Sequence, residues 1–298
     1  MNPRSAGGPW GVVPPGSHEP AKRGGSEGGR PPWLNMRLTV VGSSGSIPGP
    51  ESPASSYLVQ APFSGRTFTL VVDLGPGSLG ALYRYLEPRE VDAFALSHLH
   101  PDHCLDLCAY YVLARYSPTA PWPRQPVYGP RGAAERLSRA YDVPPLEAKD
   151  TDPGPTLAEH FDFHDWQATQ QIGPFTVTTV PVDHPVEAYA IRITHNVPGG
   201  GSLVYSGDTG PCDALGELSQ GADLLLVESS FVEQPGNPPG LHMTGKQAAE
   251  VGTRAGVGAV VLTHIPPWHD RDAVLAEALP HFPGPLSLAV TGATWEIG

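Results

Sequence analysis

Four side chains that can bind a metal stand within six residues of this chain, at His98, His100, Asp102 and His103. They follow residues 91–96, a short apolar run typical of a strand that is buried on both faces. In an extended segment residues i and i+2 project to the same side, so His98 and His100 can bind one cation together. After the turn, Asp102 and His103 can face a second cation. Imidazole with carboxylate is the ligand set of zinc, iron or manganese rather than of calcium.

A loop that is merely rich in histidine is the alternative interpretation of this segment. Three imidazoles and a carboxylate held so close together would be costly without a cation, so their spacing favours the metal site. Residues 106–116 have helical composition and end before Pro118. The cluster is therefore predicted to lie at a turn between a strand and a helix.

Three further candidate ligands, His184, Asp208 and His264, each follow a predicted strand. These strands are residues 175–182, 202–205 and 259–262. Because each candidate, like His98, comes at the carboxyl end of its strand, one edge of the sheets would bring them together. Five other histidines lack this placement and are predicted to be surface or loop residues: His160, His164, His195, His269 and His281.

Two other segments could assist such a site. The sequence Gly-Ser-Ser-Gly-Ser at residues 42–46 offers backbone N–H groups and the hydroxyls of Ser43 and Ser44 to an anionic substrate. A plain tight turn explains this segment equally well. Asp73 closes another predicted strand, where it can either orient a metal ligand or form a turn.

Composition limits the class of protein. With 298 residues the chain is long enough to bury a substantial core, and we favour one domain over two. The formal net charge of -12 opposes tight, unspecific binding to nucleic acid polymers, although local cations could still hold a small anion. Three cysteines without a Cys-x-x-Cys pair favour reduced thiols in a cytosolic protein.

The first 35 residues are interrupted by Pro, Gly and Ser and contain no apolar central region. This composition predicts a disordered extension over residues 1–35 rather than a signal peptide, followed by a single folded domain over residues 36–298. No run approaches the ~18 consecutive apolar residues of a membrane span. We therefore expect a cytoplasmic protein that has no membrane partner.

The order of these motifs resembles the metallo-β-lactamase superfamily and, within it, the ribonuclease Z-like branch. The likeness is carried by His-x-His-x-Asp-His at residues 98–103, by Asp208 in Ser-Gly-Asp-Thr, by His242-x-Thr244 and by Leu-Thr-His264. The chain is more similar still to the actinobacterial atypical class II cyclic AMP phosphodiesterases of this branch. That similarity lies in the segments Ser43-Ser-Gly-Ser, Ser52-Pro-Ala-Ser-Ser-Tyr57, Leu96-Ser-His-Leu-His, Tyr205-Ser-Gly-Asp-Thr-Gly and Leu262-Thr-His-Ile-Pro-Pro-Trp268.

The resemblance covers the chain from about Met36 onwards. It implies an α/β fold, a four-layered αββα sandwich whose site lies along one edge of two sheets. It also implies two divalent cations, for which zinc is favoured and manganese or iron could substitute. The ligands implied for the first cation are His98, His100 and His184, those for the second are Asp102, His103 and His264, and Asp208 would bridge the two.

Two cations about 3.5 to 4 Å apart suit phosphodiester hydrolysis, because they neutralise phosphate charge and lower the pKa of a shared water towards ~7. The resulting hydroxide would attack phosphorus. The resemblance places His242 beside the metals as the candidate acid for the leaving sugar oxygen, with Thr244 or the helix start behind it helping to hold phosphate. A helix-start residue in contact with solvent is the alternative for His242. Thr244 also has the spacing of a capping box with Gln247, in a helix that Gly256 ends.

The expected substrate is a small cyclic nucleotide, 3′,5′-cyclic AMP before others. The first alternative is a transfer-RNA 3′-end endonuclease, but such enzymes hold RNA with a long basic arm, and no basic insertion stands between His103 and His184. The second is a metal-binding regulatory protein without turnover, against which the presence of all seven expected ligands argues. Thioester or lactam hydrolysis would leave His242 and Thr244 without a role. A homodimer is expected only by analogy with the branch.

Overall fold

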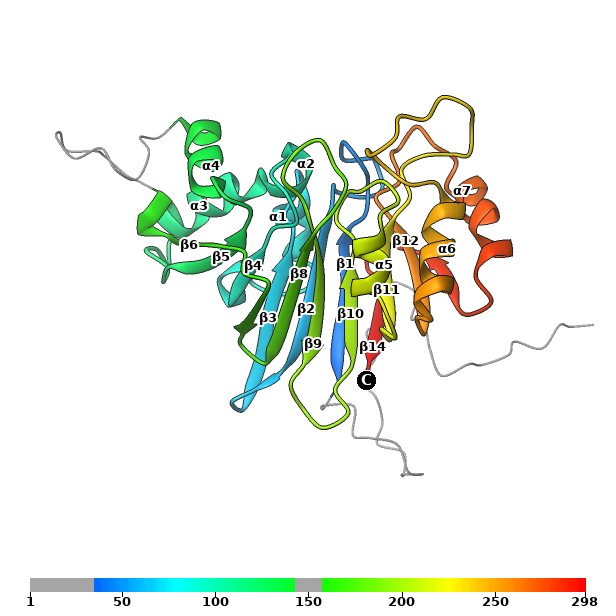
Figure 1. Cartoon of the computed structure of the whole chain (residues 1–298). Helices are drawn as coiled ribbons and strands as arrows, with labels where there is room; N and C mark the ends of the chain where they lie inside the picture. The colour runs from blue at the N-terminus through cyan, green and yellow to red at the C-terminus, as the bar shows by residue number, and fades with distance from the viewer. Residues whose placement is uncertain (1–34, 143–156) are drawn as a thin grey trace, which may run out of the picture.

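Two seven-stranded sheets lie face to face at the centre of the protein (Figure 1). The computed structural model describes residues 35–142 and 157–298. In spatial order, the first sheet contains β14 (Thr294–Ile297), β1 (Met36–Gly42), β2 (Ser56–Phe63), β3 (Arg66–Val72), β4 (Ala93–Ala95), β5 (Gln125–Gly129) and β6 (Phe161–Asp165). The second contains β13 (Leu286–Leu288), β12 (Ala259–Thr263), β11 (Leu224–Glu228), β10 (Ser202–Tyr205), β9 (Tyr189–His195), β8 (Phe175–Pro181) and β7 (Thr169–Ile172).

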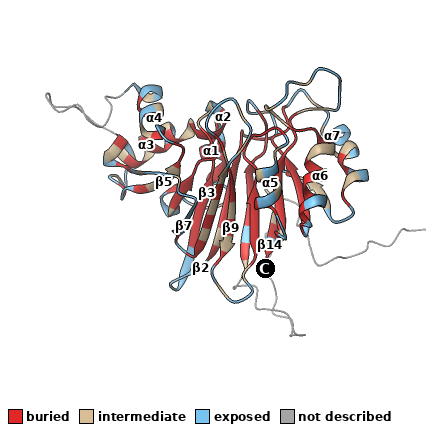
Figure 2. Cartoon of the chain, in the orientation of Figure 1, coloured by how far each residue is buried: buried red, intermediate tan, exposed pale blue. Residues whose placement is uncertain are grey.

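An apolar core fills the space between the two sheets, and it takes alternate residues of each strand. In β1, Leu38 and Val40 face this core, whereas Val41 packs on the outer side of the sheet. In β4, Ala95 faces the core and Phe94 the outer side. Burial on both faces explains why the sequences of these strands are nearly continuous apolar runs (Figure 2).

Helices cover the outer face of each sheet, so the four-layered αββα sandwich is confirmed (Figure 1). The first sheet is covered by α1 (Ser78–Leu82), α2 (Pro101–Cys104), α3 (Asp106–Tyr116) and α4 (Ala133–Tyr141). The second is covered by α5 (Asp213–Leu218), α6 (Gly245–Ala255) and α7 (Arg271–Ala278). Three short 3-10 helices are η2 (Pro88–Glu90), η3 (Leu157–Glu159) and η4 (Leu279–His281).

The strand directions of the second sheet decide where its loops gather. β9 and β10 form the predicted antiparallel hairpin, whereas β10, β11, β12 and β13 run parallel to one another. Each parallel connection passes through a helix, namely α5, α6 or α7. The carboxyl ends of these strands therefore all open at one edge of the sheet, as expected for parallel strands joined by crossover helices.

The start and end of α6 follow the sequence prediction. The Thr244 hydroxyl accepts a hydrogen bond from the backbone N–H of Gln247, and the Gln247 side chain accepts one from the N–H of Thr244. Gly256 ends the helix with φ 62°, a left-handed conformation that glycine adopts at little cost. This reciprocal cap fixes the entry angle of the segment that carries His242.

Other predicted boundaries hold less closely. The apolar run at residues 91–96 contributes a strand of only three residues, β4, and Asp92, just before it, binds Arg66. The predicted extension, apart from Asn35, and most of the predicted loop at residues 142–158 lie outside the described residues. Among the helices of the described part of the chain, none has the length and apolar character to span a bilayer.

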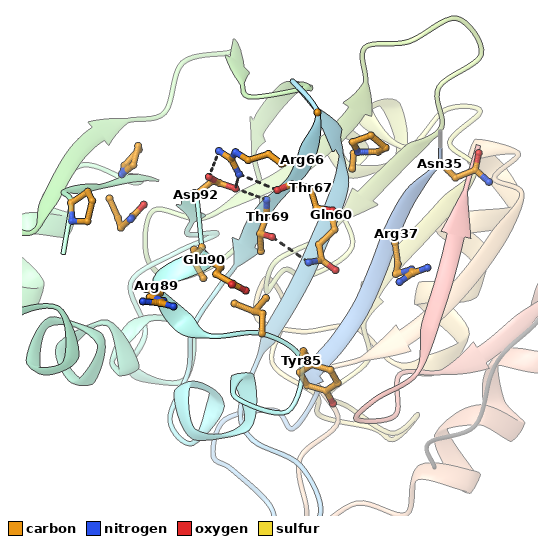
Figure 3. Close-up of a pocket in the computed structure, with 18 of the residues that line it drawn as sticks. Asn35, Arg37, Gln60, Arg66, Thr67, Thr69, Tyr85, Arg89, Glu90 and Asp92 are labelled. Carbon is orange, nitrogen blue, oxygen red and sulfur yellow. Dashed lines mark hydrogen bonds and ion pairs between the residues drawn. The ribbon is translucent and has the colours of Figure 1, made fainter. Parts of the chain in front are cut away.

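A groove of about 1180 Å³ lies on the outer face of the first sheet (Figure 3). Arg66 and Thr69, at the start of β3, line this groove, whereas Asp73 follows the last residue of the same strand at the opposite end. The groove therefore lies at the other end of β3 from the predicted metal ligands.

Candidate metal centre

The seven predicted ligands come together at the edge where the strands end. Their side chains form two groups, and within each group the potential ligand atoms lie within 4.8 Å of one another. His98 and the α2 residues follow β4, while the others follow β8, β10 and β12. The first group is His98, His100 and His184, and the second is Asp102, His103, Asp208 and His264.

Three imidazole nitrogens converge in the first group. His98 Nε2 and His184 Nε2 each lie 3.1 Å from His100 Nδ1. Two predicted features are thereby observed: His98 and His100 face the same point from an extended segment, and His184 reaches it from the other sheet. Three nitrogen donors around one point are a common part of a zinc or iron site.

The second group contains two carboxylates and two imidazoles, and Asp208 lies between the first group and the second. Asp208 Oδ1 is 3.3 Å from His103 Nε2, and Asp208 Oδ2 is 3.0 Å from His264 Nε2. The same Oδ2 atom lies 3.7 Å from His98 Nε2 of the first group. Asp102 Oδ2 completes the second group at 3.4 Å from His103 Nε2. Asp208 thus has the position that a ligand shared by two cations requires.

Buried partners orient the ligand rings from behind. Asp73 Oδ2 accepts a hydrogen bond from His103 Nδ1 at 2.7 Å, and the carbonyl of Leu241 accepts one from His184 Nδ1 at 3.1 Å. Ser55 Oγ lies 2.9 Å from His264 Nδ1. Since a carbonyl or carboxylate can only accept, Nδ1 of His103 and of His184 carries the proton and Nε2 presents its lone pair to the cluster.

Asp73 combines both roles that the sequence left open. Its φ of 55° places it in a left-handed turn. Its fully buried carboxylate also accepts hydrogen bonds from the backbone N–H and hydroxyl of Ser97 and from the Tyr205 hydroxyl, besides that from His103. A non-glycine residue in this conformation costs about 1 kcal/mol or more, and the surrounding hydrogen bonds offset that cost.

The chemistry of the cluster fits a divalent cation. His103 Nε2, His264 Nε2 and Asp208 Oδ1 are buried, and none has a hydrogen-bond partner among the described residues. Leaving such atoms unpaired costs about 1–3 kcal/mol each. Because their lone pairs point at one another, a proton donor cannot satisfy all of them, whereas a cation that accepts several lone pairs at once can.

The electrostatics of the second group favour a positive charge at its centre. Burial lowers the pKa of His103, but the carboxylates of Asp208, Asp73 and Asp102 outweigh this effect and raise it well above its ordinary value. Burial raises the pKa of Asp208, but the neighbouring imidazoles outweigh that effect and hold it well below its usual range. A divalent cation would supply the same compensation without a proton.

His242 lies beside both ligand groups. Its ring centroid is 5.7 Å from that of His184 in the first group and 5.7 Å from that of His264 in the second. Its Nδ1 donates to Oε1 of the fully buried Glu228 at 2.7 Å, which leaves Nε2 on the opposite side of the ring. Burial lowers the pKa of His242, but the Glu228 carboxylate outweighs burial and raises it to about 9.

Glu228 was not singled out from the sequence. It ends the apolar strand β11, and its carboxylate accepts hydrogen bonds from the backbone N–H groups of Thr209, Ser230 and Met243 as well as from His242. An acidic residue at the end of a buried strand was the available clue, because the same placement had already marked His98, Asp208 and His264.

The hydroxyls predicted to contact substrate have internal partners. Ser43 Oγ donates to the Ala289 carbonyl and Ser44 Oγ to the Ile47 carbonyl. Thr244 Oγ1 caps α6 and donates to Glu233 Oε2. The tight-turn interpretation therefore describes the 42–46 segment better, and none of these three hydroxyls is directed at the cluster.

The 42–46 segment supports the cluster through its backbone instead. Gly45 donates its N–H to the Ile265 carbonyl, and a Cβ atom at Gly45 would meet the His264 carbonyl oxygen at 2.2 Å. His264 itself has φ 57°, so its backbone is held in a strained conformation by this close approach. Only glycine at position 45 allows the two loops to pack in this way.

Two of the histidines expected at the surface or in loops are buried. His195 packs against Phe175 at the end of β9 that is distant from the cluster, and His160 packs against Tyr111. The prediction is therefore wrong for His195, which is buried at the end of β9, whereas His160 does lie in a turn but is buried there instead of exposed. Neither belongs to a ligand group.

Known proteins share both the sequence and the fold. Residues 69–265 match the family model of the β-lactamase superfamily domain. The uncharacterized protein Rv1339 of Mycobacterium tuberculosis is 44% identical over 89% of this chain and 93% of its own length. Ribonuclease Z of Mycolicibacterium gilvum is 32% identical over 78% of this chain and 85% of its own.

A solved structure agrees with these relatives. The crystal structure of YhfI from Bacillus subtilis, a metallo-β-lactamase fold protein, is 30% identical and covers 88% of this chain and 99% of its own with a TM-score of 0.73. The cluster described above lies where the strands of this fold end. The chain therefore belongs to the β-lactamase superfamily, in the ribonuclease Z-like branch of its metal-dependent hydrolases.

Proposed function

We propose that this protein is a phosphodiesterase that hydrolyses small cyclic nucleotides, with 3′,5′-cyclic AMP as the preferred substrate. One observation carries the proposal: a proton donor, His242, lies beside both groups of candidate metal ligands and is fixed there by the buried carboxylate of Glu228. Hydrolysis of a phosphodiester needs a proton at the leaving sugar oxygen, whereas the thiolate of a thioester departs readily without one.

The candidate ligands would hold two divalent cations, zinc before manganese or iron. His98, His100 and His184 would bind one, Asp102, His103 and His264 the other, and Asp208 both. Such cations supply Lewis acidity, which neutralises phosphate charge and makes water a nucleophile at neutral pH.

The protein's own residues would then have three roles: they orient the ligand rings, hold His242 and donate a proton. Asp73, Ser55 and the Leu241 carbonyl hold the ligand rings, so that little reorganisation is needed during the reaction. Glu228 holds the His242 ring through Nδ1. His242 Nε2 donates its proton to the sugar oxygen as the phosphorus–oxygen bond breaks, and a water proton later restores it.

Charge separates this proposal from its closest rival. The 32% identity to a ribonuclease Z supports phosphodiester chemistry in general and favours a transfer-RNA endonuclease as the second candidate. A folded RNA, however, requires many phosphate contacts from Lys and Arg, and this chain has a net charge of -12. A small cyclic phosphate needs none of those distant contacts.

Metal analysis together with a substrate panel tests the proposal. We expect about two metal ions per chain and turnover of 3′,5′-cyclic AMP to AMP that a chelator abolishes and added metal restores. The panel also includes 3′,5′-cyclic GMP, 2′,3′-cyclic nucleotides, bis(p-nitrophenyl) phosphate and a precursor transfer RNA. Cleavage of the RNA without turnover of any cyclic nucleotide would establish the second candidate instead.

A further inference from the structure

A second cavity, of about 420 Å³, lies beside the metal centre and has His242 in its wall. Its volume falls within the range of about 300–1,000 Å³ that is usual for small-ligand sites. Residues 231–240 form most of its outer wall. The His242 ring borders this cavity and also faces the leaving oxygen of the proposed reaction. The part of the substrate that is bonded to that oxygen would therefore extend into the cavity.

The outer wall is fixed at both ends. The Phe231 N–H donates to the Met243 carbonyl, and Phe231 pairs with Thr244 in an isolated parallel bridge. Within the wall, Asn237 Nδ2 donates to the Val232 carbonyl at 2.8 Å. At the other end, the Leu241 carbonyl accepts the hydrogen bond from His184. The cavity is therefore a preformed part of the site rather than a gap between unattached loops.

Part of the lining of the cavity is apolar and includes an aromatic ring. The Phe231 ring is half-buried and meets the His242 ring edge to face, with centroids 5.1 Å apart and an interplanar angle of 88°. Three prolines, Pro211, Pro238 and Pro239, extend the apolar lining. An aromatic face held beside a proton donor suits the stacking of a planar ring.

The other side carries hydrogen-bond acceptors, and apart from His242 the described lining has no cationic side chain. Among the described residues that line the cavity there are two carboxylates, Asp183 and Glu233, and neither Lys nor Arg. The Asp183 carboxylate lies against Gly240, where a Cβ atom would come within 3.2 Å of both its oxygens. No hydrogen-bond donor reaches these oxygens within residues 35–142 and 157–298. This charge opposes a second phosphate and favours a group that donates hydrogen bonds.

We propose that the cavity is a nucleobase subsite, which takes an amino-bearing base such as adenine with its face against Phe231 and its amino group toward Asp183. The inference rests on the proposed phosphodiester chemistry and names the part of the substrate that the protein recognises. It also gives a reason for excluding RNA, since a polynucleotide continuing into this space would bring phosphates next to two carboxylates.

A double-difference experiment tests the stacking contact. The base is removed from the substrate by using the abasic 1-deoxyribose 3′,5′-cyclic phosphate, and the ring is removed from the protein by Phe231→Ala. Each change alone is expected to lower kcat/KM by about 10- to 100-fold, mainly through KM, as for other stacked bases. Both changes together are expected to cost little more than either one, because each removes the same contact.

Phe63→Ala is the matched control, since Phe63 is 41% exposed in the hairpin between β2 and β3 and lines neither cavity. Phe63→Ala should change neither the turnover of the cyclic nucleotide nor that of the abasic phosphate. If Phe231→Ala lowered turnover of the cyclic nucleotide and of the abasic phosphate by equal factors, Phe231 would only support His242, and the subsite would be refuted. Metal content, measured for every variant, identifies any variant whose metal centre has been disturbed.

The acceptor is tested with substrates that differ in one group. Cyclic AMP carries an amino group where cyclic IMP carries a carbonyl, so Asp183→Asn is expected to reduce the preference for cyclic AMP by roughly fivefold. An unchanged preference would remove Asp183 from recognition.

Adenosine binding separates this inference from the proposed function, because adenosine has no phosphate. By calorimetry, adenosine should bind the metal-loaded protein and bind Phe231→Ala at least about tenfold more weakly. If that difference appears while no phosphodiester is hydrolysed, the subsite stands and the proposed function fails. If cyclic nucleotides are hydrolysed but adenosine does not bind at millimolar concentration, the subsite fails and the proposed function stands.

Discussion

The metal centre and the groove on the outer face of the first sheet lie at opposite ends of β3. They differ in whether their polar atoms have partners. The groove, at about 1180 Å³, is larger than the cavity of about 420 Å³ beside the metal centre, and four of its lining residues are arginines (Figure 3). Three of these pair with carboxylates: Arg37 with Glu296, Arg66 with Asp92, and Arg124 with Asp162. Arg66 binds Asp92 through both terminal nitrogens.

At the metal centre, by contrast, polar atoms are buried without partners among the described residues. His103 Nε2, His264 Nε2 and Asp208 Oδ1 face one another in the interior. Buried polar atoms without partners destabilise a fold unless a ligand binds them. Size and charge alone would select the groove as the functional site. The buried polar atoms without partners indicate the metal centre instead. They are the more informative property, because a bound ligand must offset the free energy that they cost.

The largest effect is expected from Asp208→Ala. Asp208 Oδ2 is a carboxylate oxygen that lies close to histidines of both groups, His98 and His264. Removing it should release most of both metal ions and lower kcat/KM at least about 1,000-fold, because it removes charge neutralisation at both sites. Metal analysis of the purified protein and the rate on cyclic AMP measure the two effects.

Asp92→Asn is the control at the other end of β3, since Asp92 is a carboxylate that is less buried than Asp208 and is paired with a cation. Its metal content and rate should stay within about twofold of the wild type, because surface ion pairs contribute little. Full metal content and full activity in Asp208→Ala would show that Asp208 does not bridge two ions.

His242→Ala should rank second. Loss of a positioned acid is expected to lower kcat on cyclic AMP by roughly 10²- to 10⁴-fold, while both metals remain bound. The defect should be smaller with bis(p-nitrophenyl) phosphate, whose leaving group departs readily without a proton. Parallel rate measurements on the two substrates test this, and equal losses would indicate that His242 positions phosphate instead.

Glu228→Gln provides the companion measurement. The amide would retain the size of the side chain but not the charge that holds the His242 imidazolium, so an intermediate loss of about 10- to 100-fold in kcat is expected. If Glu228→Gln lowered turnover while His242→Ala did not, the carboxylate would act through the backbone N–H groups that it binds and not through the ring.

The ligand residues could be predicted because two local properties marked them. Their side chains have the right donor atoms, and each follows a strand, either directly, as Asp208 does, or in the turn and helix after it, as His103 does. Glu228 has both properties, but it does not belong to either ligand group. Its role depends on a 2.7 Å contact with His242, fourteen residues away, which only the tertiary fold creates.

The fold was predictable where the apolar pattern is strong and not elsewhere. Residues 106–116 end at the predicted positions as α3, and the capped α6 does so as well. β7, with the sequence Thr-Gln-Gln-Ile, has little apolar pattern because it is an edge strand that pairs only with β8. β14 is defined by its pairing with β1, at the opposite end of the chain, which no local pattern encodes.

Asp73→Asn should have a smaller effect than loss of a ligand. The amide would keep a turn-forming side chain at φ 55° but weaken the acceptor that holds His103 Nδ1. Metal affinity is expected to fall by about 10- to 100-fold, the usual range for a partner behind a ligand, and excess metal should restore most of the activity. Titration with zinc against a competing chelator measures the affinity, and activity that excess metal cannot restore would contradict an orienting role.

The smallest effect is expected in the groove, from Arg66→Ala. The ion pair with Asp92 has side chains that are 58% and 17% exposed, so its loss should lower the free energy of unfolding by about 1 kcal/mol or less. Asp92 would still accept the backbone N–H of the buried Thr69, which preserves the start of β3. Urea denaturation measures the stability, and the rate on cyclic AMP should be unchanged.

Arg89→Ala is the control, because Arg89 lines the same groove and has no ion pair within the described part of the chain. It should leave the free energy of unfolding unaltered. A change of more than threefold in hydrolysis by Arg66→Ala, with the fold intact, would show that β3 couples the two ends and that the groove serves the reaction after all.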